Sequence, residues 1–176
     1  MVIINQIIME TLLITIVPSI LILLFFVFSD RFKEPKKIII ITFLFGILIT
    51  IPAGYLNDFI LKTFETESEL NNALLGGFFA GGLVEETLKF LVLYFYILKE
   101  KAFNEPMDAI VYGVCVSLGF SLMETIEWSK IYFDEYGENR AVAMAKIRSY
   151  SSNILHAGCG VIMGSILSKA FFQNKN

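Results

Sequence analysis

The sequence predicts an all-α fold, a polytopic membrane helix bundle of about five transmembrane helices with short amphipathic linkers. The first observation is the composition, because hydrophobic side chains make up 56% of the 176 residues and charged ones only 18%, unlike a soluble domain. The second is that the apolar residues form five runs long enough, at about 20 residues, to cross a bilayer as helices. We therefore expect a single integral membrane domain, residues 1–176.

The five predicted spans have features that membrane helices tolerate. Pro18 lies inside the first and Pro52 near the end of the second, and helix packing in membranes accommodates such kinks. Pro106 suits the first turn of the fourth helix, and Asp108 favours the positive N-terminal end. The spans are residues 8–28, 37–56, 73–98, 106–128 and 150–172.

Basic residues are distributed unevenly over the connections between these spans. One side carries Arg31, Lys33, Lys36, Lys37, Lys99, Lys101, Lys169 and Lys175, and the other Lys62, Lys130, Arg140, Lys146 and Arg148. Connections rich in Lys and Arg stay cytoplasmic, so we expect a multi-pass cell-membrane protein with its N-terminus outside and its C-terminus cytoplasmic. The linkers 57–72 and 129–149 are predicted to lie along the outer interface as short helices.

The net charge gives no indication of a nucleic-acid partner, and the lipid bilayer is expected as a partner from the apolar composition. The formal net charge is −3, and the basic cluster 31–37 is the longest, so no nucleic-acid partner is expected. Cys115 and Cys159 both lie in apolar runs and are expected to pack as small hydrophobic side chains.

The third span carries three charged residues near its middle, Glu85, Glu86 and Lys89. A charged residue at bilayer depth costs about 2.5–3.5 kcal/mol on insertion scales. On a helix, Lys89 is the i,i+4 neighbour of Glu85 and the i,i+3 neighbour of Glu86, so one ammonium can reach both carboxylates. Charged residues placed this way in a membrane helix indicate a functional site.

Small residues mark the faces on which these and two further polar groups lie. Gly77 and Gly81 precede Glu85 at i+4 spacing, and small residues flank Glu124 on the fourth span and His156 on the fifth. Membrane helices approach closely along such stripes. The members on the fourth and fifth spans are Gly113, Ser117, Phe120, Ser121, Ser152, Gly160 and Gly164, with Arg148 one turn before Ser152. We therefore predict that spans three to five meet in one cluster of Glu85, Glu86, Glu124 and His156.

The predicted helix ends place these groups at different depths. At about 1.5 Å per residue, Glu124 and His156 lie roughly 6–9 Å inside the outer ends of their helices, and Glu85 roughly 18 Å. A later start of the third span, or a tilt, is expected to reduce this difference.

A buried cluster of carboxylates with one imidazole is suited to hydrolysis. Such a site can remove a proton from water and return one to a leaving amine. An H-E-x-x-H zinc motif is excluded by the single histidine, and a G-x-S-x-G serine motif is absent. The aspartates, at positions 30, 58, 108 and 134, lie at helix edges or in loops. Hydrolysis by glutamate side chains is the mechanism that these exclusions leave.

The cofactor requirement stays open at this level. His156 with several glutamates could hold a divalent metal such as zinc and leave a position for water. A metal-free pair is the alternative, with Glu86 as the base and His156 holding the water and the oxyanion. Spacing does not decide whether Glu85 or Glu86 is the base, because the two point about 100° apart on a helix.

These motifs resemble those of the PrsW family of intramembrane proteases, which is related to the CAAX-prenyl protease/Abi superfamily. The resemblance covers residues 75–165 and rests on E-E-x-x-K at Glu85 to Lys89, NEPMDAIVYG at 104–113, F-x-x-x-E at Phe120 and Glu124, and the isolated His156. It implies hydrolysis of a membrane-anchored protein, with anti-sigma factors as one substrate class. It also implies that the Glu pair and His156 are catalytic; Lys89, Phe120 and Arg148 are expected to support them.

Two other classes of protein fit the same residues. Buried carboxylates can relay protons or ions in a transport element, and an inactive binding or immunity-type membrane protein can retain such a scaffold. Purely structural roles are also open. Glu85, Glu86 and Lys89 could form an ion pair that holds helices together, Glu124 could be a carboxylate at the membrane interface, and His156 could donate a hydrogen bond between helices.

Overall fold

The computed structural model describes residues 2–172, with side chains from residue 13 onward. This part of the chain is helical and contains no strand. Its elements are α1 (Val2–Ser29), α2 (Lys36–Leu48), α3 (Thr50–Phe64), α4 (Glu69–Leu74), the π-helix η1 (Leu75–Val84), α5 (Glu85–Phe95), the 3₁₀-helix η2 (Ile97–Lys99), α6 (Pro106–Tyr136) and α7 (Glu138–Phe172). The predicted all-α class is confirmed; Lys175 lies outside the described residues.

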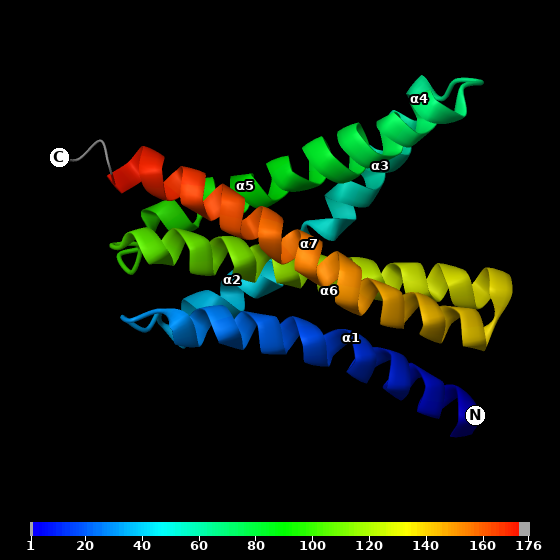
Figure 1. Ribbon diagram of the computed structural model, residues 1–176, viewed down its shortest axis with the longest axis horizontal. Helices are drawn as coiled ribbons and strands as arrows, with labels where there is room; N and C mark the ends of the chain where they lie inside the picture. The colour runs from blue at the N-terminus through cyan, green and yellow to red at the C-terminus, as the bar shows by residue number, and fades with distance from the viewer. Residues whose placement is uncertain (1, 173–176) are drawn as a thin grey trace.

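These elements form five long helical stretches (Figure 1). α2 and α3 follow one another with only Ile49 between them, and α4, η1 and α5 are continuous. By length and composition, Lys36–Phe64, Pro106–Tyr136 and Glu138–Phe172 are able to cross a membrane, and α1 contributes the shorter apolar stretch Leu13–Ser29. The predicted multi-pass helix bundle is confirmed, whereas the orientation of its termini stays a prediction.

α6 is the central helix of the bundle. It packs along α7 and also contacts α2, α1 and α5, and Figure 1 shows α6 and α7 crossing the middle of the molecule together. The residues from 111 to 122 are all buried. A helix that is apolar on every side requires neighbours on every side, which explains why the run from Val111 to Leu122 occupies this place.

Glycines allow α6 to approach its neighbours at backbone distance. A Cβ added to Gly160 of α7 would lie 2.6 Å from the carbonyl oxygen of Gly113 on α6, and one on Gly46 of α2 would collide with the carbonyl of Val116. The predicted close-packing faces of the fourth and fifth spans are therefore confirmed. Gly119 of α6 also lies in the contact with α2. α2 is therefore a third helix in this close packing.

The glycines of the third span have a different role from the one predicted. They lie in η1, where hydrogen bonds run i→i+5, and a Cβ on Gly81 would meet only the carbonyl oxygen of Gly76, 3.3 Å away in the same helix. Around Gly77 there is open space. The expectation that these glycines admit another backbone is wrong, and the i+4 spacing holds only from Glu85 onward.

The connections between the long helices are shorter than predicted. α6 continues to Tyr136 and α7 begins at Glu138, so Gly137 alone joins them, with φ +81°; this left-handed conformation suits glycine. α3 similarly extends to Phe64. The prediction of separate short helices in 57–72 and 129–149 is therefore wrong.

Because the helices are longer than predicted, most of the predicted difference in depth between Glu85 and the pair Glu124 and His156 disappears. Glu124 lies 12 residues before the end of α6 at Tyr136, and His156 lies 18 residues after the start of α7 at Glu138. These spacings correspond to about 18 and 27 Å. Glu85, 16 residues after the start of α4 at Glu69, lies about 24 Å along its own stretch. The three groups can therefore meet.

Candidate active site

Three helices bring the predicted site residues together. α5 contributes Glu85, Glu86 and Lys89 from its first two turns, α6 contributes Phe120 and Glu124, and α7 contributes Arg148 and His156. One ligand atom from each of Glu85, Glu124 and His156 lies within 4.8 Å of the other two. The predicted meeting of the three helices is therefore present in the structure, while the catalytic roles of these residues stay predictions.

The ammonium of Lys89 is the centre of this arrangement. Its Nζ lies 2.7 Å from Glu86 Oε1, 3.9 Å from Glu85 Oε2 and 2.8 Å from His156 Nδ1. The same atom lies 4.2 Å from the centroid of the Phe120 ring, a cation–π distance. Lys89 is fully buried, and a buried cation requires such a complete set of partners.

His156 is held at both ring nitrogens. An ammonium offers only donors, so Nδ1 accepts from Lys89 and the ring proton belongs to Nε2. Nε2 then donates to Glu124 Oε2 at 3.1 Å. The Phe120 ring lies beside the imidazole, with centroids 5.7 Å apart. The contacts thus favour one neutral tautomer in one orientation.

Glu124 has its charge compensated by Arg148. Its Oε2 lies 2.5 Å from Arg148 Nη2, and its Oε1 accepts from Trp128 Nε1 at 3.2 Å. The guanidinium in turn donates to Ser152 Oγ at 3.0 Å and to Thr125 Oγ1 at 3.4 Å. Both oxygens of Glu124 are therefore engaged, and the carboxylate is fixed between α6 and α7.

The two adjacent glutamates differ in their surroundings. Glu85 is 6% exposed, and its Oε1 accepts from Asn57 Nδ2 of α3 at 3.4 Å. The side chain of Glu86 is 27% exposed, and its Oε2 has no hydrogen-bond partner among the described residues. Glu86 is thus a partly exposed carboxylate of the cluster whose unpaired oxygen, Oε2, is itself buried.

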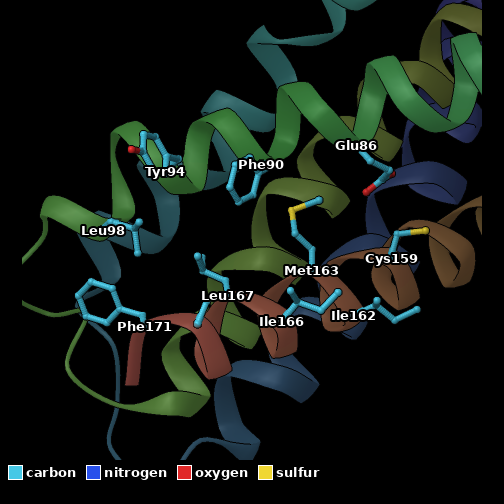
Figure 2. Close-up of a pocket in the computed structure, with 11 residues that line it drawn as sticks. Glu86, Phe90, Tyr94, Leu98, Cys159, Ile162, Met163, Ile166, Leu167 and Phe171 are labelled. Carbon is cyan, nitrogen blue, oxygen red and sulfur yellow. The ribbon is translucent and has the colours of Figure 1, made fainter. Parts of the chain in front are cut away.

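A cavity of about 650 Å³ leads to Glu86 between α5 and α7. Figure 2 shows the Glu86 carboxylate and Cys159 at one end of it, and Leu98 and Phe171 at the other. Apart from these ends its lining is apolar or aromatic. The further lining residues are Phe90, Tyr94, Ile162, Met163, Ile166, Leu167 and Ala170.

Several contacts of the cluster were not predicted from the sequence. Trp128 follows Glu124 by four residues, and Ser152 follows Arg148 by four, so helical spacing could have identified both. Asn57 lies 28 residues from Glu85 and was interpreted as part of a linker. No local signal connects it to the site.

The cluster fits a divalent metal ion in the kind and spacing of its donors. Glu85, Glu124 and His156 would supply two carboxylate oxygens and one imidazole nitrogen within 4.8 Å of one another. Catalytic zinc sites use three such protein ligands and leave a position for water. A metal on Nε2 would replace the ring proton found between His156 and Glu124.

Fold and site together define a polytopic membrane protein with a buried glutamate–histidine cluster of the kind used for hydrolysis. Residues 34–176 match the family described as PrsW family intramembrane metalloprotease. The chain therefore belongs to the PrsW family, and the predictions of family and of protease class are confirmed. No solved structure matches the chain significantly.

Relatives from several bacteria carry the name Protease PrsW. The protein of Geobacillus kaustophilus is 33% identical over 161 residues, 91% of this chain and 66% of the relative. The protein of Bacillus subtilis is 33% identical over 159 residues, which cover 90% of this chain and 67% of the relative. The protein of Clostridioides difficile is 34% identical over 173 residues, which cover 96% of this chain and 69% of the relative. The chain spans about two thirds of the length of the curated relatives it matches.

Proposed function

We propose that this chain is an intramembrane endopeptidase that hydrolyses a peptide bond of a membrane-anchored protein. The single observation that carries the proposal is the buried cluster in which Glu85, Glu124 and His156 converge beside a carboxylate, Glu86, that has a free oxygen. Membership of a family of intramembrane metalloproteases supports it.

In this proposal Glu86 is the general base. Its unpartnered Oε2 takes a proton from a water molecule while the water oxygen bonds to the scissile carbonyl carbon. The C–N bond then breaks, and the proton passes from Glu86 to the leaving amine nitrogen, so the products are a carboxylic acid and an amine. Lys89, 2.7 Å from Glu86 Oε1, orients the carboxylate for the proton transfer.

Glu85, Glu124 and His156 would hold the metal that the family description implies. A divalent ion such as zinc, when bound, polarises a carbonyl and makes water a better nucleophile. Arg148 fixes Glu124, and Phe120 packs against both Lys89 and His156. In the metal-free alternative, the Nε2–H of His156 donates to the developing oxyanion.

The substrate reaches Glu86 with an apolar segment in the cavity between α5 and α7. The cavity follows α5 and then η2 from Glu86 to Leu98, and its lining suits a membrane-spanning stretch. Its continuity with Glu86 supports a cut near the Glu86 end. An anti-sigma-factor-type membrane protein is the substrate class that the family resemblance implies.

Comparison of membrane proteins from expressing cells tests this function. Cells carry the wild type, Glu86→Gln, His156→Ala or the exposed control Asp58→Asn, and new N-termini are labelled and identified by mass spectrometry. We expect termini within membrane segments that need Glu86 and His156, with a loss of about 100-fold or more in each variant and none in the control.

Purified protein completes the test. The proposal is overturned if correctly folded Glu86→Gln and His156→Ala proteins still cleave a substrate found in this way at the wild-type rate. Proton flux into liposomes without any cleavage would instead support a transport element.

A further inference from the structure

A second buried group of carboxylates lies away from the candidate active site. Asp30 follows the end of α1, Glu34 lies in the α1–α2 connection, and Asp108 lies in the first turn of α6. One ligand atom from each lies within 4.8 Å of the other two. Asp108 precedes Glu124 by 16 residues, about 24 Å along α6, so the proposed hydrolysis does not use this group.

These three carboxyl groups lie together without a neighbouring cation. Asp30 is 3% exposed, Glu34 9% and Asp108 0%. Within the described part of the chain, none of them forms an ion pair with Lys or Arg. Arg31 and Lys33 are the nearest cations in sequence, but the Arg31 guanidinium lies over the Phe32 ring, 5.5 Å from its centroid, and the Lys33 Nζ donates to the backbone carbonyls of Val27, Phe28 and Asp30. Several buried carboxylates without compensation are costly.

The hydrogen bonds of the group leave two specific oxygens unused. Asp108 Oδ2 accepts from the backbone amides of Asn104 and Glu105, both at 2.8 Å, and Asp30 Oδ1 accepts from the Phe32 amide at 3.2 Å. The other oxygens, Asp108 Oδ1 and Asp30 Oδ2, are buried and have no hydrogen-bond partner. A buried oxygen without a partner requires an explanation, and a bound ion is one that accounts for two such oxygens in the same cluster.

We propose that Asp30, Glu34 and Asp108 form a binding site for a hard divalent cation, Mg²⁺ or Ca²⁺. The donors are carboxylate oxygens alone, which these ions prefer. The two orphaned oxygens supply ligands that no protein donor occupies. The bound cation joins the α1–α2 connection to the start of α6 and so stabilises the central helix against its neighbours.

The electrostatics of Glu34 agree with a positive partner. Burial, the charge of Asp108 and a hydrogen bond with it, and the charge of Asp30 raise the pKa of Glu34 to about 7, although the hydroxyl of Tyr112 donates to its Oε2. In the absence of a cation, a proton on Glu34 is the competing way to reduce the negative charge.

Metal binding is measured on the full chain in detergent after removal of metals with EDTA and dialysis. The His156→Ala variant serves as background because it removes the imidazole ligand of the other cluster. Mg²⁺ or Ca²⁺ is titrated, and bound metal and melting temperature are recorded. We expect saturable binding of one cation per chain and a rise in melting temperature of about 5 °C or more at saturation.

Isosteric variants identify the ligands. Asp30→Asn and Glu34→Gln, each in the His156→Ala background, are expected to weaken cation binding about 10-fold or more. Tyr112→Phe, which removes the hydroxyl but no carboxylate, and Asp58→Asn, an exposed carboxylate, are expected to bind as the background does. Because Asn and Gln keep the shape of the side chains, both variants are expected to fold.

Three results would overturn the proposal. The first is that neither Mg²⁺ nor Ca²⁺ binds the background protein at millimolar concentration. The second is that Asp30→Asn and Glu34→Gln both bind as tightly as the background. The third is a melting temperature that depends on pH but on neither cation, which would assign the site to a proton. None of these results bears on peptide cleavage.

Discussion

Lys89 Nζ of α5 lies 2.8 Å from His156 Nδ1 of α7, and its ion-pair partner Glu86 lines the cavity between these two helices. Phe90 and Tyr94 of α5 and Leu98 of η2 face α7 across this cavity. The contact therefore connects the helix that carries the glutamate pair to the helix that carries the histidine. It also fixes the tautomer of the imidazole.

Removal of the Lys89 ammonium is expected to destabilise the folded protein. Lys89→Met leaves the buried Glu85 and the partly buried Glu86 without a cation, and breaking a buried ion pair in this way costs about 3–5 kcal/mol. The double variant Lys89→Met/Glu86→Gln should recover part of this loss. Thermal unfolding in detergent measures both effects.

Lys62→Met is the control for the Lys89 prediction. Lys62 pairs with Asp58 at 2.7 Å, but both side chains are more than half exposed, so a change of about 0–1 kcal/mol is expected. Equal stability of Lys89→Met and Lys62→Met would contradict a central role for the buried ammonium.

The protonation of His156 can be observed directly because the chain contains one histidine. Protein labelled with ¹⁵N-histidine gives a single pair of ring nitrogen signals. Without metal at neutral pH, we expect the neutral tautomer with its proton on Nε2, because Nδ1 faces an ammonium. Lys89→Met should shift the population toward the other tautomer.

Zinc addition provides a second readout in the same spectra. If Glu85, Glu124 and His156 hold zinc, the Nε2 signal changes and the ring proton moves to Nδ1, so the Lys89 ammonium has to leave this nitrogen. Glu85→Gln should weaken this change, since it removes one ligand. A dominant Nδ1–H form before any metal is added would show that the Lys89 contact is absent in solution.

The close approach of α6 and α7 predicts different outcomes for two glycines of α7. A Cβ on Gly160 would lie 2.6 Å from the Gly113 carbonyl oxygen, whereas one on Gly158 meets nothing within 4 Å. Gly160→Ala is therefore expected to destabilise the protein by about 1–3 kcal/mol or more. Gly158→Ala should be neutral or slightly stabilising, because alanine favours helices. Similar melting temperatures for the two variants would argue against the close α6–α7 contact.

The part of the site that follows helical periodicity could be predicted from the sequence. Glu85, Glu86 and Lys89 are linked by i+3 and i+4 spacing, and the glycines of α6 and α7 identify the faces that meet. The capping role of Asp108 is likewise confirmed by its capping box with Glu105. Local spacing was sufficient for all of these contacts.

Contacts between distant segments could not be predicted in the same way. Tyr112 and Glu34, which form a hydrogen bond, are 78 residues apart. Asp108 was interpreted as a helix cap, and this role offered no reason to expect further carboxylates near it. The π-helix also escaped prediction, because glycines at four-residue spacing fit an α-helical packing stripe equally well. Its i→i+5 geometry depends on the surrounding structure, since a wide turn is seldom favoured by sequence alone.

The raised pKa of Glu34 predicts a pH dependence of stability in metal-free protein. Burial raises this pKa to about 7, above the value of about 4.3 in an unfolded chain. Between these values the folded state binds more protons than the unfolded state, so stability falls as pH rises from about 4.5 to 7 and levels off above that. In EDTA, wild type and Glu34→Gln should therefore melt alike at pH 5, whereas at pH 8 the wild type should melt a few degrees lower. Asp30, Asp108 and Tyr112 face Glu34 in both proteins, so the difference isolates this carboxyl group. A gap that is equal at both pH values, or larger at pH 5, would contradict the burial of Glu34 as the cause.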